Sequence, residues 1–127
     1  TKERRGLVLI DPPFEEAGEF ERLVDGLKTA HRRWPTGIYA LWYPIKDLPP
    51  VRRFHAQLRQ SGIGKIMLTE LLVRAATSAE SLNGSGLVIV NPPWRLAAAL
   101  VPLLSWLGER LAQGPGAAGT WRWLVPE

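Results

Sequence analysis

A short apolar run, Leu7-Val8-Leu9-Ile10, ends directly at the tetrapeptide Asp11-Pro12-Pro13-Phe14. A continuous apolar run of this length between Gly6 and a proline is typical of a strand that is covered on both faces, as in a parallel sheet. Proline has no backbone N–H to donate to a neighbouring strand, so the two prolines also end the strand. We therefore predict a buried strand over 7–10 with Asp11 at its carboxyl end.

The following segments repeat the order of helix and strand. Apolar residues recur at helical spacing from about Ala17 to Trp34, which predicts an amphipathic helix. A second buried strand is predicted over 38–43, a second helix over 49–60, and a third strand over 65–74. Alternating strands and helices of these lengths indicate parallel strands joined by helical crossovers.

The pattern changes after residue 74. Residues 75–85 carry no apolar helical stripe, and a parallel return normally needs a crossover of about a dozen residues or more. We therefore predict that the next strand, 87–90, is antiparallel to the one before it. A long helix from Leu96 and a last strand over 120–125 follow. The predicted fold is α/β, with three parallel strands and then an antiparallel strand, flanked by helices in a single domain over residues 1–127.

The amino-acid composition excludes some kinds of protein and some kinds of site but does not identify a function. The 127 residues include no cysteine, which excludes disulfides and thiolate metal sites. No window approaches the ~20 apolar residues of a membrane span, and the charged N-terminal residues run directly into a strand. We therefore expect no signal peptide, no membrane partner and a cytoplasmic protein. The net charge of +4 permits a phosphate-bearing partner but does not require one, because the basic residues are scattered.

An acidic residue, two prolines and an aromatic ring at the end of a strand are suited to holding a flipped adenine. The Asp11 carboxylate and the Pro12 carbonyl oxygen can each accept a hydrogen bond from the exocyclic amine, which directs the nitrogen lone pair at an incoming methyl group. Phe14 can stack on the base, a contact worth about 1–3 kcal/mol. We expect Asp11, Pro12, Pro13 and Phe14 to be catalytic in an adenine-N6 methyltransferase. The simpler alternative is that Asp11 caps the next helix.

A second tetrapeptide, Asn91-Pro92-Pro93-Trp94, follows the predicted strand 87–90 and offers similar chemistry. If that strand is antiparallel, its carboxyl end lies at the opposite edge of the sheet from Asp11. We therefore expect Asn91 to cap a helix and Trp94 to pack in the interior.

The sequence supports an expectation for each of four other side chains. Tyr43, near the end of the second strand, is a candidate for substrate binding at the base pocket and is otherwise a core residue. Glu70 interrupts an apolar strand, and a neighbouring arginine is its expected partner. His31 and His55 have no partners at metal-ligand spacing, so we expect no metal site.

Four blocks of the sequence jointly resemble one family. They are residues 5–15, 36–44, 84–94 and 123–127, and they resemble the bacterial RlmJ (YhiR-like) methyltransferases. The predicted strand order likewise resembles the second half of the seven-stranded, Rossmann-like sheet of S-adenosylmethionine-dependent methyltransferases. The resemblance implies transfer of a methyl group from S-adenosyl-L-methionine to N6 of one adenine in 23S ribosomal RNA, in a protein-free or early assembly state.

By that resemblance Asp11 is the catalytic and cofactor-binding aspartate, and Phe14 stands where the family usually has tyrosine, keeping the stacking face. The family also has an N-terminal half with a glycine-rich strand, which this sequence lacks. We expect the chain to supply the target-base half of the site and to be inactive alone. Two alternatives stay open: a DNA adenine-N6 or cytosine-N4 methyltransferase, and a non-catalytic α/β module that docks on RNA or a partner subunit.

Overall fold

The computed structural model describes residues 4–14 and 18–126, which form five strands and three helices. The elements, in chain order, are β1 (Leu7–Ile10), α1 (Glu19–Arg33), β2 (Ile38–Ile45), α2 (Leu48–Gln60), β3 (Ile66–Leu72), β4 (Gly84–Val90), α3 (Leu96–Arg110) and β5 (Ala118–Val125). Ala17, the predicted start of the first helix, lies outside the described residues.

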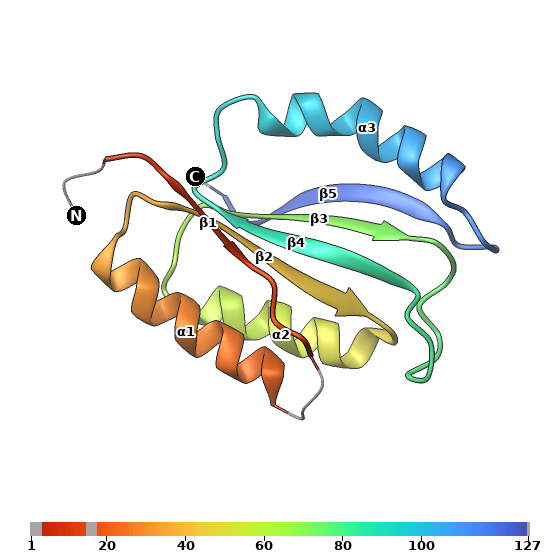
Figure 1. The fold of residues 1–127 in the computed structure, drawn as a ribbon, viewed down its shortest axis with the longest axis horizontal. Helices are drawn as coiled ribbons and strands as arrows, with labels where there is room; N and C mark the ends of the chain where they lie inside the picture. Colours follow the sequence, from red (N-terminus) through yellow and green to blue (C-terminus); the bar gives the residue numbers. More distant parts are fainter. Residues whose placement is uncertain (1–3, 15–17, 127) are drawn as a thin grey trace.

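A five-stranded sheet with the order β1-β2-β4-β3-β5 forms the centre of the molecule. Helices α1 and α2 cover one face of the sheet, and α3 lies on the other face (Figure 1). This three-layer arrangement confirms the predicted α/β fold.

The strand directions confirm one topological prediction fully and another in part. Strand β4 is antiparallel to both β2 and β3, as the short connection after residue 74 predicted. However, β4 lies between β2 and β3, so β1 and β2 form the only parallel pair in the described sheet. Parallel pairing among the first three strands is therefore confirmed for β1 and β2 alone: β3 runs in the same direction as β2 but pairs with β4 and, on its other side, with the antiparallel β5.

The helices begin and end where local chemistry favours it. Helix α1 has acidic residues in its first turn and basic residues in its last, which complements the helix dipole. Its end is marked by Trp34, whose N–H donates to the Ala30 carbonyl, and Pro35 follows. Helix α2 carries prolines in its first turn. The N–H groups of a first turn make no hydrogen bond within the helix, so proline, which has no N–H group, costs nothing there.

The main core lies between the sheet and helices α1 and α2. Alternate residues of β2 (Tyr39, Leu41, Tyr43 and Ile45) are buried on this side. On β1, Val8 and Ile10 pack against the same core, whereas Leu7 and Leu9 point to the other face and are 66% and 68% exposed, so the prediction of a buried strand over 7–10 was wrong for one face. Helix α3 contacts β5 and β3, so it leaves the β1 side of that face uncovered. Among the described helices, none combines the length and apolar character needed to span a bilayer.

Candidate functional site

The tetrapeptide 11–14 lies at the edge of the sheet where β1, β2 and β3 end, which we call the carboxyl edge. Asp11 follows the last residue of β1 and is exposed, while Pro12 beside it is half-buried. Ligands of open α/β sheets bind outside the carboxyl ends of the strands. The structure therefore leaves the Asp11 carboxylate accessible at the edge where a ligand would approach.

Phe14 is held in an unusual backbone conformation by two other aromatic rings. Its φ of 51° lies in the left-handed region, which costs a residue with a side chain about 1–2 kcal/mol. The ring centroid lies 5.1 Å from that of Phe20 and 6.0 Å from that of Trp42, with interplanar angles of 60° and 73°. Edge-on contacts of this kind are favourable, so packing fixes the orientation of the Phe14 ring.

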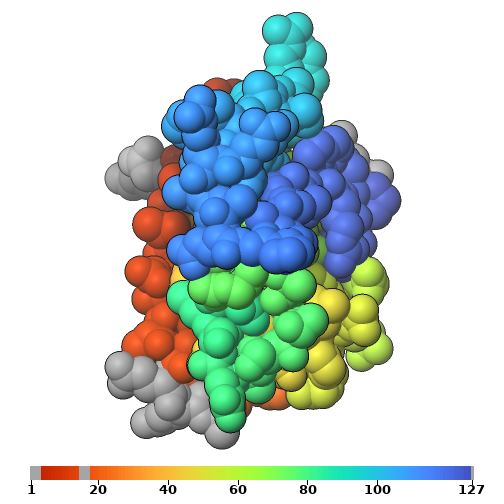
Figure 2. All heavy atoms as spheres, turned by 90° about the vertical axis from the view of Figure 1, so that its right-hand side faces the viewer, coloured from red at the N-terminus to blue at the C-terminus, as the bar shows by residue number. Residues whose placement is uncertain are grey.

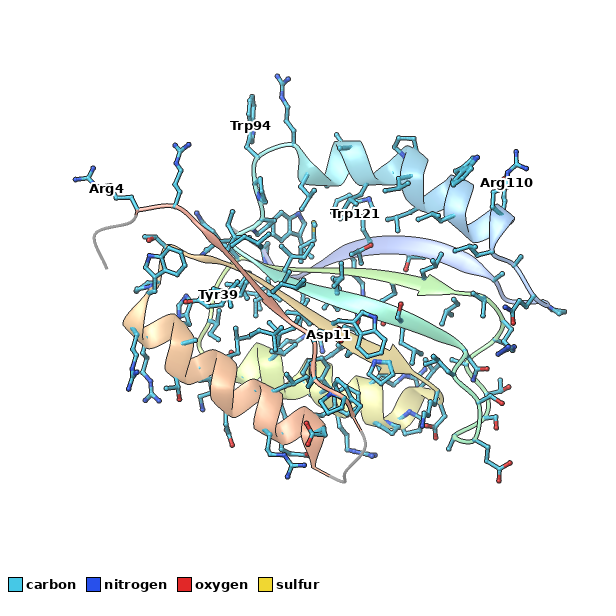
Figure 3. All side chains as sticks on the ribbon, viewed as in Figure 1. Arg4, Asp11, Tyr39, Trp94, Arg110 and Trp121 are labelled. Carbon is cyan, nitrogen blue, oxygen red and sulfur yellow. The ribbon has the colours of Figure 1, made fainter. Side chains whose placement is uncertain are left out.

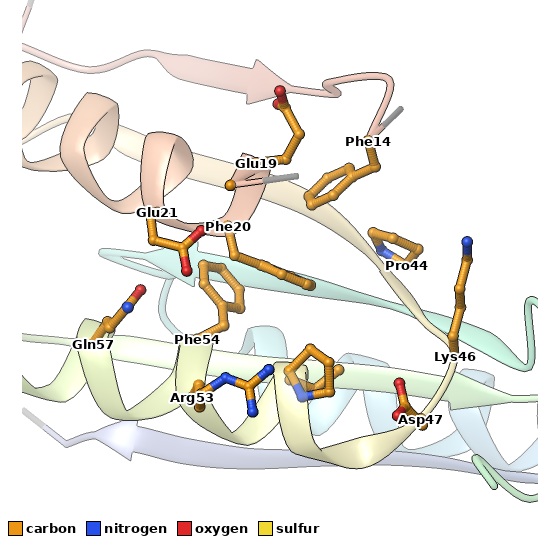
Figure 4. Close-up of a pocket in the computed structure, with 13 residues that line it drawn as sticks. Phe14, Glu19, Phe20, Glu21, Pro44, Lys46, Asp47, Arg53, Phe54 and Gln57 are labelled. Atoms are coloured by element: carbon orange, nitrogen blue, oxygen red, sulfur yellow. The ribbon is translucent and has the colours of Figure 1, made fainter. Parts of the chain in front are cut away.

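Phe14 also forms part of the wall of a pocket of about 410 Å³ between the first turns of α1 and α2 (Figure 4). Aromatic and aliphatic side chains and five charged ones line this pocket: Phe14, Phe20, Pro44, Pro50, Val51, Phe54, Glu19, Glu21, Lys46, Asp47 and Arg53, with Gly18 and Gln57. Asp11 does not line it. The structure thus brings Phe14, but not Asp11, to the pocket.

The polar part of the pocket was not predicted from the sequence. Gln57 lines the pocket, and its Oε1 atom is buried and has no hydrogen-bond partner among the described residues. Gln57 lies in the interior of α2, and its sequence position gives no sign of this role. The charged residues of the pocket could have been predicted in another way. Each helix that follows a parallel strand begins at the carboxyl edge, so polar residues in its first turn are candidates for lining a site there.

The structure places Tyr43 in the core, because its side chain is 0% exposed and faces α2. Its hydroxyl donates to Glu70 Oε2 over 2.9 Å and lies 3.1 Å from His55 Nε2. Burial, followed by the charge of Glu70, raises the pKa of Tyr43 far above its ordinary value, so the hydroxyl stays protonated. Tyr43 therefore serves the interior, and its phenol is the observed partner of Glu70.

His55 completes this buried group. An Arg122 nitrogen lies 3.2 Å from His55 Nδ1, and since arginine can only donate, Nδ1 is the acceptor. The hydrogen of the neutral ring is then on Nε2, directed at the Tyr43 oxygen. Burial, and then the positive charges of Arg122 and Arg59, lower the pKa of His55 to about 4. The ring is neutral at physiological pH.

The tetrapeptide 91–94 lies at the opposite edge, where β1, β2 and β3 begin, which we call the amino edge. The Asn91 side-chain amide donates to the carbonyl oxygens of Pro35 and Gly37 over 2.8 and 2.9 Å. The residue at the N-cap position of α3 is Arg95, so the expectation that Asn91 caps the helix was wrong. The expectation that Trp94 packs in the interior was also wrong, because its side chain is 84% exposed.

The described residues fit only part of an S-adenosyl-L-methionine site. Asp11 is an exposed carboxylate next to β1, which has β2 as its one partner strand in the described sheet. Dinucleotide-type cofactors also need a glycine-rich turn after a strand, and the first residues after β1 and β2 are Asp11-Pro12 and Lys46-Asp47. No set of three or more His, Cys, Asp or Glu side chains within 4–14 and 18–126 is arranged to hold a metal ion.

Comparison with known proteins gives consistent relatives. Residues 1–125 match the model of the family described as "Ribosomal RNA large subunit methyltransferase D, RlmJ". The protein "Ribosomal RNA large subunit methyltransferase J" of Escherichia coli strain K12 is 38% identical over 124 residues, which cover 98% of this chain and 44% of that protein. The protein of the same name in Haemophilus influenzae is 38% identical over 128 residues, covering 99% and 45%.

A solved structure agrees with these relatives. The crystal structure of protein LPL1258 from Legionella pneumophila superposes with a TM-score of 0.78 at 26% sequence identity, over 94% of this chain and 43% of that one. The chain thus spans a little under half the length of each of these three proteins.

Proposed function

Because the chain belongs to the RlmJ family of ribosomal RNA large subunit methyltransferases, we propose that it supplies the target-base half of an enzyme that methylates N6 of an adenine in 23S ribosomal RNA. The names of the two curated relatives favour ribosomal RNA over DNA as the substrate. The proposed reaction takes place in the cytoplasm, on RNA that is free of protein or in an early stage of assembly.

The observation that carries this proposal is the arrangement of Asp11 and Phe14 at the carboxyl edge. The Asp11 carboxylate is exposed, and three residues later the Phe14 ring is held by Phe20 and Trp42 in one orientation. A flipped adenine that stacks on Phe14 recovers part of the stacking it loses in the RNA. A fixed ring also costs less entropy on binding than a mobile one.

Asp11 would act on the amine in two ways. Its carboxylate and the Pro12 carbonyl oxygen would each accept a hydrogen bond from one N–H group of the amine, which orients the nitrogen lone pair. S-adenosyl-L-methionine, when bound, supplies an electrophilic methyl group. As positive charge develops on the amine nitrogen, the nearby carboxylate would stabilise it and then accept the released proton.

The test uses a fusion of this chain to the part of the Escherichia coli relative that it does not match. We expect the fusion to methylate 23S ribosomal RNA, and Asp11→Asn to lower kcat by about 10²–10⁴-fold with little change in KM. Asp25→Asn, at an exposed position in α1, is the matched control and should leave kcat unchanged.

Two results would contradict the proposal. One is a fusion that unfolds cooperatively on heating, and is therefore folded, but methylates duplex DNA in preference to ribosomal RNA or methylates neither. The other is full activity of Asp11→Asn, which would favour a module that docks on RNA without catalysis.

A further inference from the structure

The amino edge of the sheet gathers basic residues from four separate segments. Six exposed cations lie there: Arg4, Arg5, Arg32, Arg33, Lys65 and Arg95. These residues precede β1, end α1, precede β3 and follow β4. The described segments that carry them (4–6, 31–37, 61–65 and 91–96) contain no aspartate or glutamate. Residues that look scattered in the sequence therefore lie at the same edge, in four described segments that carry positive charge alone.

Backbone and side-chain hydrogen bonds hold these segments together around Asn91. Its side chain binds the carbonyl oxygens of Pro35 and Gly37, just after α1. Its own N–H donates to the Lys65 carbonyl over 3.0 Å, and the Ile38 N–H donates to the Gly6 carbonyl over 3.0 Å. The cations are thus carried on a connected framework, which lowers the entropy lost when a partner binds several of them.

An exposed aromatic ring and a cation project from the same edge. The Trp94 ring is 84% exposed, and the Arg95 guanidinium carbon lies 4.2 Å from its centroid. The segment that follows β4 stands out from the rest of the molecule (Figure 2), and Trp94 points away from the body of the protein. Positive φ values of 53° at Asn91 and 71° at Arg95 bracket the turn. Strained backbone of this kind tends to occur at binding sites.

We propose that the amino edge is a second RNA-contact surface, in which Trp94 stacks on an unpaired base and the six cations bind phosphates. An exposed aromatic ring beside a cationic groove is the arrangement by which proteins bind single strands without reading their sequence. The choice of RNA as the partner rests on the proposed function. The surface itself is separate from Asp11 and Phe14, because Arg4 and Asp11 lie at opposite ends of β1 (Figure 3).

The test measures the affinity of the 127-residue chain for a fluorescein-labelled single-stranded RNA, using the fluorescence anisotropy of the label. We expect Trp94→Ala to weaken binding by about tenfold. The double variant Arg32→Gln/Arg33→Gln should reduce the slope of log Kd against log salt by about one to two, because each lost phosphate contact removes roughly 0.7–0.9.

The matched control lies on α3. Trp106 is 53% exposed and has the guanidinium carbon of Arg110 5.7 Å from its ring centroid, but it lies near the end of α3 away from the amino edge. Trp106→Ala should therefore leave the RNA affinity unchanged. Since Trp94 is exposed, Trp94→Ala should melt at the wild-type temperature. If it does not, Lys65→Gln/Arg95→Gln is the second variant, and it should show the same loss of affinity.

Three outcomes would overturn the inference. The first is that the wild-type chain does not bind the RNA, and the second is that Trp94→Ala and Trp106→Ala lower the RNA affinity equally. The third is that Trp94→Ala leaves the RNA affinity unchanged but dissociates a dimer, as seen in sedimentation. The proposed function fails separately. In the fusion, Asp11→Asn should abolish methylation and keep the RNA affinity. A wild-type fusion that binds RNA through Trp94 but does not methylate it would reject the function and support this surface.

Discussion

Four side chains from four elements meet beneath α2: Tyr43 of β2, His55 of α2, Glu70 of β3 and Arg122 of β5. Each hydrogen bond has a defined direction, from Arg122 to His55, from His55 to Tyr43 and from Tyr43 to Glu70. Removing one member would leave its neighbours buried without a partner, which costs more than the bond itself contributes. This group therefore fixes how α2 sits on three strands of the sheet.

The lowered pKa of His55 predicts how stability depends on pH. In the unfolded chain a histidine has a pKa near 6.5, whereas in the folded protein that of His55 is about 4. Between these two pH values the unfolded chain binds a proton at His55 that the folded protein does not bind. The contribution of His55 to the free energy of unfolding is therefore fully present above pH 6.5 and decreases as the pH is lowered toward 4. We expect a loss of about 3 kcal/mol across this window.

Urea denaturation of wild type and His55→Phe at several pH values measures this effect. The difference in unfolding free energy between the two proteins should change across the window, because carboxylates titrate in both and cancel. A constant difference from pH 7 to pH 4.5 would contradict the assignment.

Sequence reasoning at single residues succeeded where backbone position decides the environment. Asp11 lies at the carboxyl end of its strand, as the apolar run and the two prolines predicted. Sequence reasoning failed for side chains whose surroundings depend on which strands are neighbours in the sheet. Trp94 was expected to be a packing residue because its strand ends at the edge opposite Asp11, but its side chain is 84% exposed. Glu70 is tolerated in an apolar strand because the Tyr43 phenol, 27 residues earlier in sequence, lies next to it.

At the scale of elements, α3 depends on two glycines to lie close to β5. A Cβ atom on Gly119 would overlap the backbone of Leu104, and one on Gly108 would lie 2.9 Å from the Gly119 nitrogen. Helix and strand backbones are therefore nearly in contact at this point. Much of α3 is exposed, with Val101, Leu103 and Trp106 about half accessible, so this narrow contact carries much of its attachment.

Gly119→Ala should therefore destabilise the protein by about 1–3 kcal/mol, as expected for a methyl group inserted into a packed site. The overlap is with backbone, which cannot rotate away. Gly64→Ala is the control, because its Cβ would have no atom within 4 Å. Thermal or urea unfolding of the two variants should separate them, and equal stabilities would show that α3 can shift without loss.

The elements themselves were largely predictable, because apolar periodicity reports which side of a helix or strand is buried. The predicted helix over 49–60 is α2 (Leu48–Gln60), and the predicted strand over 120–125 is the latter part of β5 (Ala118–Val125). The order of strands in the sheet was not predictable in the same way. Insertion of β4 between β2 and β3 depends on pairing between residues far apart in the chain, which local patterns do not encode.

At the scale of the whole molecule, β1 is the end strand of the described sheet and carries two leucines that face solvent. A strand with an unpaired edge and apolar side chains tends to pair with another chain. We expect the 127-residue chain to associate in a concentration-dependent way, and Leu9→Lys to reduce this association. Leu82→Lys, at a position that is 53% exposed in another part of the molecule, is the control. Sedimentation velocity that shows the same association for all three proteins would rule out β1 as the contact.

The distance between the two edges of the sheet has a consequence for the minimal substrate. Ile10 pairs with Leu41 of β2 and Val90 pairs with Tyr39, so Asp11 and Asn91 are about four residues apart along β2, or about 13 Å at about 3.3 Å per residue. A single nucleotide that contains the adenine can occupy the Asp11 end alone. If the chain acts as proposed and the amino edge binds RNA, efficient modification would need a transcript that contacts both Asp11 and Trp94, so the length of the RNA would affect turnover in addition to the modified nucleotide.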